Sequence, residues 1–594
     1  MASDYEAISM DNIRRRGEEF DDIGALLAEQ LYSDQTHFVY ELLQNAQDAL
    51  KRRRIKEPSH TYPKSVHFDL YPNRLEMRHY GDTFTSADVK AISDILSGTK
   101  TSDTKQIGRF GIGFKSVYAF TEVPKIHSGD EHFSITRYIR PKAVPPVPLI
   151  PGETLFIFPF NHKNKKPEET YEQIRERLAD LGLRTLLFLD EIDHIVWSFE
   201  GVRAGAYIRD RKKVEEDIWR ISLLGEEGDK TSEEHWLVFQ RYIVVQDTTV
   251  ELAFKLGQDE KTKKEFIQPI EQSMLCAYFE TGIETRLKFL IQGHYHTTPS
   301  RDNIKTDDDY NLELISETSR LLIDTLQKMK AMNMLSIKTL EAMPINEDHF
   351  PEKSIFRPFY ESFLQAMKTM PFLPTANGKY ITADEAKLAR GSDLINLLSD
   401  EDLEALFGSE KNFYWLSEEI TRDKTPALRE YLMSELDIDE IDPEKFARVI
   451  HEDFLKEQPD EWFVKFYEFL SGQPALLSSP RIYSRKGILR TKPIIRTEQN
   501  TLMTPFGDDD LPQVFLPGLT ESSFPIVKRK IAADEKAIGF LRGLGITEPE
   551  IFDEVMKFVL PKYCDGENVS DKNHIEDIQK IYQALDIPNS EKKK

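Results

Sequence analysis

Three polar side chains share one face of a predicted helix near the start of the chain. Glu41, Asn45 and Asp48 are spaced i, i+4 and i+7, so a helix over residues 41–49 places them in one row. The carboxylate of Glu41 can orient or deprotonate a water molecule. The amide oxygen of Asn45 can ligate Mg²⁺ without adding charge. This set of groups suits a site for a metal-bound nucleotide.

A glycine-rich segment further along the chain supplies the second half of this predicted site. Gly108, Gly111 and Gly113 form the pattern Gly-x-x-Gly-x-Gly and run into a predicted helix. The backbone N–H groups of such a turn, together with the helix dipole, favour phosphate oxygens. The two segments therefore predict an ATP site.

Two commoner nucleotide motifs do not fit the same segment. A P-loop requires a lysine directly after its last glycine, but here Phe114 separates Gly113 from Lys115. A Rossmann fingerprint requires a third glycine where this chain has Ser116. Both motifs also follow an early strand, whereas this segment follows a predicted helix and hairpin.

The elements that must position these residues alternate between helices and strands, so we predict an α+β fold. Apolar alternation predicts a β-hairpin over residues 64–80 and further strands in the first 165 residues. A helix at 167–188 leads into a strand-rich block, which a long helix at 311–332 closes. The remainder is predicted to be mostly helical. The predicted domains are 1–165, 166–335, 336–480 and 481–594.

Composition limits the class of protein. The chain has 594 residues, of which 40% are hydrophobic, 11% aromatic and 30% charged, which is typical of a multidomain globular protein. A net charge of −24 argues against a surface made for nucleic acid. Only two cysteines are present, which fits a reducing compartment. No signal peptide or membrane span is visible, so we expect a cytoplasmic protein without membrane partners.

The pair of motifs resembles the GHKL ATPases, which include Hsp90-like chaperones, type II topoisomerases, MutL and histidine kinases. Their Glu-x3-Asn-x2-Asp-Ala helix is matched by Glu41, Asn45, Asp48 and Ala49, and their glycine-rich lid by residues 108–113. The sequences of residues 111–129 and 289–304 are similar to those of the sacsin-like branch. The resemblance implies a Bergerat-type α/β sandwich at 1–165, then a second α/β domain and a mainly helical C-terminal half.

The resemblance also implies further cofactor-binding residues, with one departure. Gly81 matches the first glycine of the family's Asp-x-Gly-x-Gly motif, and Thr154 stands for a threonine found late in the domain. His79 takes the place of the adenine-binding aspartate, which puts base specificity in question. Phe114 and Lys115, which follow the last glycine, complete the predicted ATP contacts.

Arg301 has two interpretations. It follows a Pro-Ser turn after the second strand-rich block, where the resemblance suggests a sensor of the γ-phosphate that assists catalysis. The alternative is a structural salt bridge with the adjacent Asp302.

The function implied is a Mg-ATP-binding and slowly hydrolysing ATPase in which closure of a lid, residues 97–113, drives a conformational change. A chaperone-like role, with a protein client or partner subunit and a nucleotide-dependent homodimer, is the first interpretation. One alternative is the ATPase of a bacterial phage-defence (antiviral) or DNA-processing system. Another is a nucleotide-gated binding module without hydrolysis.

Overall fold

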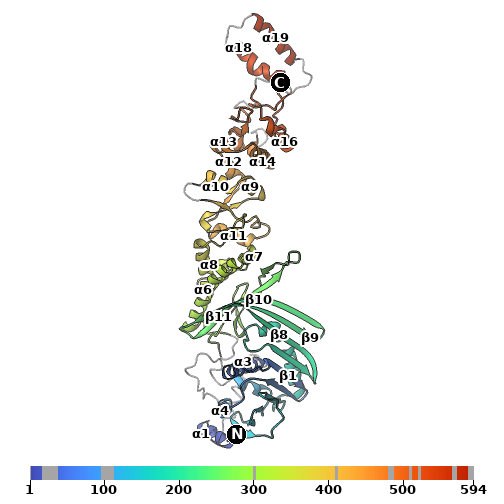
Figure 1. Cartoon of the computed structure of the whole chain (residues 1–594), viewed down its shortest axis with the longest axis vertical. Helices are drawn as coiled ribbons and strands as arrows, with labels where there is room; N and C mark the ends of the chain where they lie inside the picture. Colours follow the sequence, from blue (N-terminus) through green and yellow to red (C-terminus); the bar gives the residue numbers. More distant parts are fainter. Residues whose placement is uncertain are drawn as a thin grey trace. The chain divides into compact units, whose positions relative to one another are not determined.

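A computed structural model describes most of the chain (Figure 1). The residues described are 2–16, 38–94, 113–298, 303–408, 412–478, 487–507, 512–518, 524–564 and 571–585. The chain divides into two compact units, Met1–Ala366 and Met367–Lys594.

One continuous mixed sheet organises the first unit. Its described strands follow the order β14-β13-β15-β11-β10-β9-β8-β7-β1-β2-β6-β3-β4-β5, and β12 pairs with β11. The strands are β1 (Ser65–Tyr71), β2 (Arg74–His79), β3 (Lys125–Ser128), β4 (Glu131–Thr136), β5 (Arg140–Ala143), β6 (Thr154–Pro159), β7 (His194–Phe199), β8 (Val202–Glu215), β9 (Ile218–Glu227), β10 (Lys230–Ile243), β11 (Thr248–Gln258), β12 (Glu265–Ile267), β13 (Met274–Ala277), β14 (Phe279–Glu284) and β15 (Leu290–Gly293). The predicted hairpin at 64–80 is confirmed as β1 and β2.

A parallel pair of strands joins the two predicted α/β blocks. Strand β1 lies parallel to β7, with Ser65 opposite His194 and Leu70 opposite Phe199. The strand-rich block that follows residue 166 is therefore a continuation of the first sheet. The strands of this block are coloured green in Figure 1. The predicted α+β class is confirmed, while the four predicted domains stay predictions.

Helices of the first unit differ in length from the sequence prediction. They are α1 (Tyr5–Arg16), α3 (Phe38–Lys56), α4 (Ser86–Ser93), η2 (Gly113–Ala119), α5 (Pro167–Ala179), η3 (Leu183–Leu186), α6 (Asp309–Ala331), α7 (Ile337–Glu341), η4 (Glu347–His349) and α8 (Arg357–Thr369), which crosses into the second unit. The helix predicted at 167–188 ends at Ala179, because Gly182 adopts a left-handed φ of 78° that interrupts it. The helix predicted after the glycine-rich segment is the seven-residue 3-10 helix η2.

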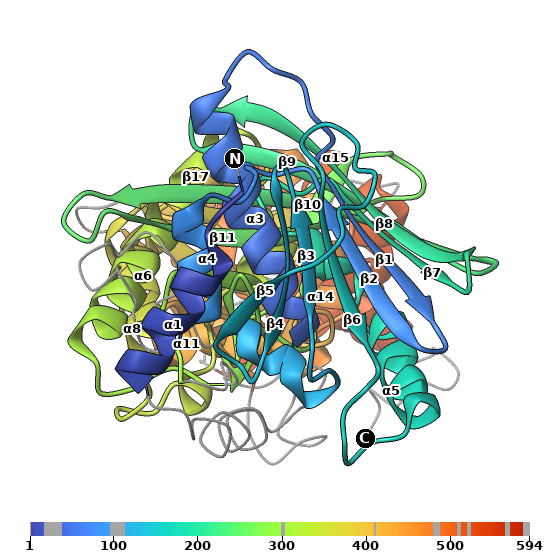
Figure 2. The same cartoon turned by 90° about the horizontal axis from the view of Figure 1, so that it is seen from below.

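Helix α3 is held by the core of the first unit. Its apolar side, including Leu42, Leu43 and Ala46, is buried in one cluster with Phe68 and Met77 of the β1–β2 hairpin. Helices α1, α3 and α4 lie together beside this part of the sheet (Figure 2). This packing fixes the orientation of the polar side of α3, which carries the motif residues.

The second unit is mainly helical, as predicted. Its helices are α9 (Ser392–Leu397), α10 (Asp400–Phe407), α11 (Pro426–Ser434), α12 (Pro443–Val449), α13 (Glu452–Glu457), α14 (Asp460–Ser471), α15 (Arg529–Ala532), α16 (Glu535–Gly543), α17 (Ile551–Glu554), α18 (Leu560–Cys564) and α19 (Asp571–Leu585), with short turns η5 (Ala383–Glu385), η6 (Pro474–Leu477), η7 (Ile488–Thr491) and η8 (Val555–Val559). Its short strands are β16 (Leu373–Pro374), β17 (Tyr380–Ile381), β18 (Ala386–Ala389), β19 (Tyr414–Trp415), β20 (Asp439–Ile441), β21 (Ile495–Arg496) and β22 (Leu502–Met503). Among the described helices of both units, none combines the length and apolarity needed to span a bilayer.

Candidate nucleotide site

The first predicted motif lies on α3, and its three polar residues differ in how far they are exposed to solvent. Glu41 is buried, with 3% of its surface exposed, whereas Asn45 is exposed and Asp48 is half-buried. Helical spacing explains why the three residues share one face. Their exposures differ because this face is turned toward the core at Glu41 and toward solvent at Asn45. An accessible amide beside a shielded carboxylate is an arrangement that can hold a metal ion and activate a water molecule.

The structure brings Glu41 against the end of the glycine-rich segment. A Cβ atom built on Gly113 would overlap Oε2 of Glu41 and lie 2.8 Å from its Cδ. A side chain at position 113 would require the carboxylate of Glu41 to move. The two motifs that the sequence analysis combined are thus in direct contact in the described structure.

A second close approach joins Ala49 to Gly81. A Cβ on Gly81 would lie 2.5 Å from Cβ of Ala49 and 2.7 Å from its carbonyl carbon. The N–H of Asp82 donates a hydrogen bond to the Ala49 carbonyl, with 2.9 Å between N and O. Small residues at both positions let the segment after β2 cross α3 at backbone distance, which explains why both motifs require them.

His79 is neutral in this structure and accepts a hydrogen bond through one ring nitrogen. It lies on β2 opposite Thr154 of β6, and only 2% of its surface is exposed. Its Nδ1 accepts a hydrogen bond from the N–H of Gly81 at 3.1 Å, which assigns the ring proton to Nε2. Burial, reinforced by Arg52, lowers the pKa of His79 to about 3. The aspartate that the resemblance places here would instead accept a hydrogen bond.

Thr154 has a partner that the sequence analysis did not single out. Its Oγ1 lies 2.6 Å from Oγ of Ser128 on the neighbouring strand β3, and both residues are fully buried. Ser128 also accepts a hydrogen bond from the N–H of Phe84 at 3.0 Å. The stretch Ile126–Gly129 carried the family resemblance, but nothing in its residue types indicated that the hydroxyl of Ser128 would meet Thr154.

Lys115 and Phe114 are turned inward in the described structure. Nζ of Lys115 donates hydrogen bonds to the carbonyls of Ile92 and Tyr138, each at 2.7 Å. Burial lowers the pKa of Lys115 to about 7. The ring of Phe114 packs 6.0 Å from that of Phe156 in the core. The assignment of both residues as ATP contacts stays a prediction, and Lys115 would have to leave two carbonyls to reach a phosphate.

Three predicted site residues lie outside the described residues. They are Gly108, Gly111 and Arg301, and most of the predicted lid at 97–113 lies outside as well. Their roles stay predictions. Within the described ranges, no group of three or more His, Cys, Asp or Glu side chains is arranged to hold a metal ion.

Helix α3 also contacts the strand-rich block through residues that the sequence analysis missed. Tyr40, the residue before Glu41, packs its ring 4.6 Å from that of Phe279 on β14. The guanidinium of Arg177 on α5 lies 4.7 Å from the centre of the same tyrosine ring. These aromatic contacts tie the helix that carries Glu41 to elements far along the chain.

Comparison with known proteins points to one group of relatives. Residues 77–136, which include His79 and Gly81, match the sacsin domain family. The sacsin-like resemblance is therefore confirmed. Human sacsin is 50% identical over 48 residues, which are 8% of this chain and 1% of sacsin.

Two other relatives extend the comparison. The protein NO VEIN of Arabidopsis thaliana is 28% identical over 331 residues, or 51% of this chain and 11% of that protein. The chaperone protein HtpG of a Sulfurovum species is 29% identical over 117 residues, or 16% of this chain and 19% of HtpG. The aligned part of the chain spans about a tenth of the length of NO VEIN. These matches support an Hsp90-like GHKL relationship for this chain.

Proposed function

We propose that this chain binds Mg-ATP on the polar face of α3 and hydrolyses it slowly, with a chaperone-like conformational output. The observation that carries the proposal is the contact between the buried carboxylate of Glu41 and Gly113. A general base shielded from bulk water and placed at the end of a phosphate-binding glycine segment is the arrangement that ATP hydrolysis requires.

Each described residue of the α3 face has a role in this proposal. Glu41 orients and deprotonates the attacking water. The exposed amide oxygen of Asn45 ligates Mg²⁺, and that ion, when bound, neutralises charge on the phosphates. The proposal assigns contacts with the base to Asp48 and, from the neighbouring strands β2 and β6, to His79 and Thr154. The chemistry of this donor set, an amide oxygen beside carboxylates, fits a hard divalent cation.

The contact of α3 with β14 supports coupling to the strand-rich block. Because the ring of Tyr40 packs on Phe279, a shift of α3 on hydrolysis is transmitted to β14. We propose that Arg301 senses the γ-phosphate from that block, and that lid closure promotes homodimerisation in the cytoplasm. The similarity to HtpG favours a protein client, and the net charge of −24 disfavours nucleic acid.

The deciding experiment compares ATP turnover and ATP binding in Glu41→Gln. This change keeps the shape of the side chain but removes its basicity, so turnover should fall by about 10²-fold or more while Mg-ATP affinity is retained. Glu172→Gln on α5 is the matched control, since Glu172 is exposed and distant in sequence from the site. Full turnover in Glu41→Gln would refute the assignment of the base.

A second measurement separates the biological alternatives. Turnover of the unmodified chain is measured with an unfolded protein and, separately, with double-stranded DNA. Stimulation by the unfolded protein is the expected result. Stimulation by DNA alone would instead favour a role in DNA processing or phage defence.

A further inference from the structure

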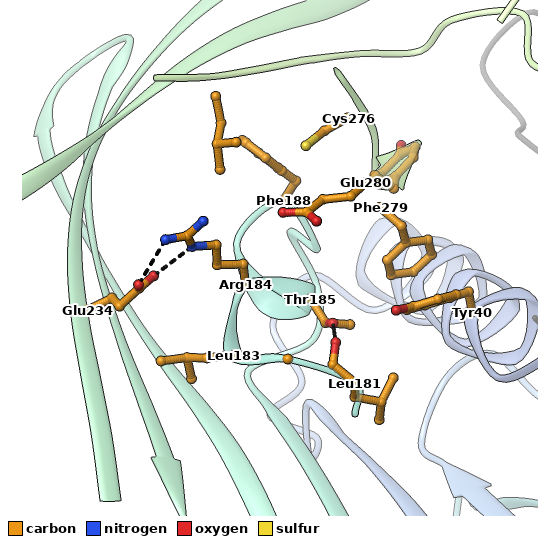
Figure 3. A pocket seen from close by; sticks show the side chains of 13 residues that line it. Tyr40, Leu181, Leu183, Arg184, Thr185, Phe188, Glu234, Cys276, Phe279 and Glu280 are labelled. Carbon is orange, nitrogen blue, oxygen red and sulfur yellow. Dashed lines mark hydrogen bonds and ion pairs between the residues drawn. The ribbon is translucent and has the colours of Figure 1, made fainter. Parts of the chain in front are cut away.

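A cavity of about 290 Å³ lies between α3 and the strand-rich block of the first unit (Figure 3). Tyr40 of α3 forms one wall. The segment Leu181–Phe188 and the strands β10, β13 and β14 form the others. Among the described residues, its lining shares none with the predicted nucleotide site. The volume suits a small molecule rather than a nucleotide.

One end of the cavity carries excess positive charge. Arg184 donates hydrogen bonds to both carboxylate oxygens of Glu234, at 3.0 and 3.1 Å. Glu234 also accepts hydrogen bonds from Nζ of Lys255 at 2.7 Å and from the indole N–H of Trp236 at 3.1 Å. Two cations therefore share one carboxylate. Figure 3 shows the third guanidinium nitrogen of Arg184 turned away from Glu234.

Another part of the cavity wall carries a carboxylate. Glu280 of β14 is exposed, and Figure 3 shows its carboxylate directed into the cavity beside Phe188. Within the described ranges, Glu280 forms no ion pair. A cationic end and an anionic side thus face one small space.

The rest of the cavity lining is mostly apolar. Leu181, Phe188 and Leu290 line the space together with the rings of Tyr40 and Phe279. Cys276 also lines it and is buried, and burial raises the pKa of its thiol well above the usual range. The thiol therefore stays neutral and behaves as a small apolar group.

We propose that this cavity binds a small zwitterion with an apolar body, namely a free α-amino acid with a large apolar side chain. Its carboxylate would meet Arg184 and its ammonium would meet Glu280, while its side chain would pack among Phe188 and Leu290. Both charges of the ligand are then matched, which is the condition for burying them. Binding at this cavity does not depend on the proposed ATPase activity.

The test is isothermal titration calorimetry of the full chain with L-phenylalanine and L-leucine. Two analogues of phenylalanine each lack one charge: phenethylamine has no carboxylate, and 3-phenylpropionate has no ammonium. Each should bind at least about tenfold more weakly than phenylalanine, the scale of one charge-assisted hydrogen bond. Equal binding of either analogue would overturn the proposal of a zwitterion.

Variants of the cavity locate the binding. Glu280→Gln should weaken phenylalanine about tenfold but leave 3-phenylpropionate unaffected. Glu284→Gln, on the same strand and paired with Arg286, is the matched control and should not change either affinity. Arg184→Leu should weaken phenylalanine and 3-phenylpropionate alike. If that variant does not fold, the comparison of Glu280 with Glu284 still decides, because both side chains are on the surface of β14.

Two results would refute the site. One is the absence of binding heat for both amino acids up to about 10 mM, which is weaker than any useful recognition. The other is an unchanged phenylalanine affinity in Glu280→Gln. Neither result bears on ATP binding at α3, so a failure here is distinguishable from a failure of the proposed function.

Discussion

Replacing Gly113 by alanine tests the contact that joins the two halves of the candidate site. The added Cβ atom would overlap Oε2 of Glu41 and lie 2.8 Å from its Cδ, whereas ordinary contacts begin at 3.4 Å. Because Glu41 is buried, its carboxylate has little room to move aside. Gly113→Ala should therefore destabilise the surroundings of α3 by about 1–3 kcal/mol, the usual cost of overpacking.

A double-mutant cycle isolates this contact from other effects. In a Glu41→Ala background the clashing atoms are absent, so adding Gly113→Ala should cost no more than about 0.5 kcal/mol. The expected coupling energy is then about 1–3 kcal/mol. Gly539→Ala in α16 is the matched control, because no atom lies within 4 Å of a Cβ built there. Because Gly539 belongs to the second unit, that change should leave the opening free energy of α3 unchanged.

Native-state hydrogen exchange at Leu42 and Leu43 of α3 measures the opening free energy in each variant. This readout needs no nucleotide and reports on the first unit alone. If Gly113→Ala costs the same with and without the Glu41 side chain, the two residues are not in contact. The proposed pairing of base and glycine segment would then be wrong.

Three further predictions concern the site and two histidines with lowered pKa values, His79 of the site and His294, which directly follows β15 and lies 2.6 Å from the hydroxyl of Tyr278. Asn45→Ala should lower the Mg-ATP affinity measured by calorimetry by at least about tenfold, or about 1.4 kcal/mol. The melting temperature should not change, because Asn45 is exposed. An unchanged affinity would mean that Asn45 is not the metal ligand. Burial holds the pKa of His79 at about 3 and that of His294 at about 4, against 6.5 in an unfolded chain, so below pH 6.5 the unfolded state binds more protons and stability falls as pH decreases toward these values. Each histidine should lower the free energy of unfolding by about 2 kcal/mol between pH 7 and pH 5, as measured by urea unfolding. If His79→Gln or His294→Gln does not reduce this dependence of stability on pH, the prediction is wrong. His79→Asp removes the ring N–H and introduces a carboxylate, which only accepts hydrogen bonds. It should raise the preference for ATP over GTP by about tenfold in nucleotide titrations, and an unchanged ratio would mean that the base does not meet residue 79.

Local elements of the fold and the identity of the motif residues could be read from the sequence. The spacing of Glu41, Asn45 and Asp48 predicted a shared helix face, and α3 confirms it as one helix. Alternation over residues 64–80 predicted the hairpin of β1 and β2. These inferences succeed because helix and strand periodicities follow from backbone geometry within a few residues. The same local rules failed at Gly182, since a left-handed glycine ends a helix without changing the apolar pattern around it.

Contacts between distant segments could not be read from the sequence. The pairing of β1 with β7, which makes one sheet of two predicted blocks, depends on where the chain returns rather than on any local pattern. The hydrogen bonds that Lys115 donates to the carbonyls of Ile92 and Tyr138 were likewise not indicated by its place beside a glycine-rich segment. The sequence by itself thus determined which residues are the candidates for the chemistry and which helix carries the first three of them. Only the tertiary structure decided that Glu41 meets Gly113 and that Arg184 and Glu280 face one cavity, because such contacts arise from the burial of apolar surface shared among many elements.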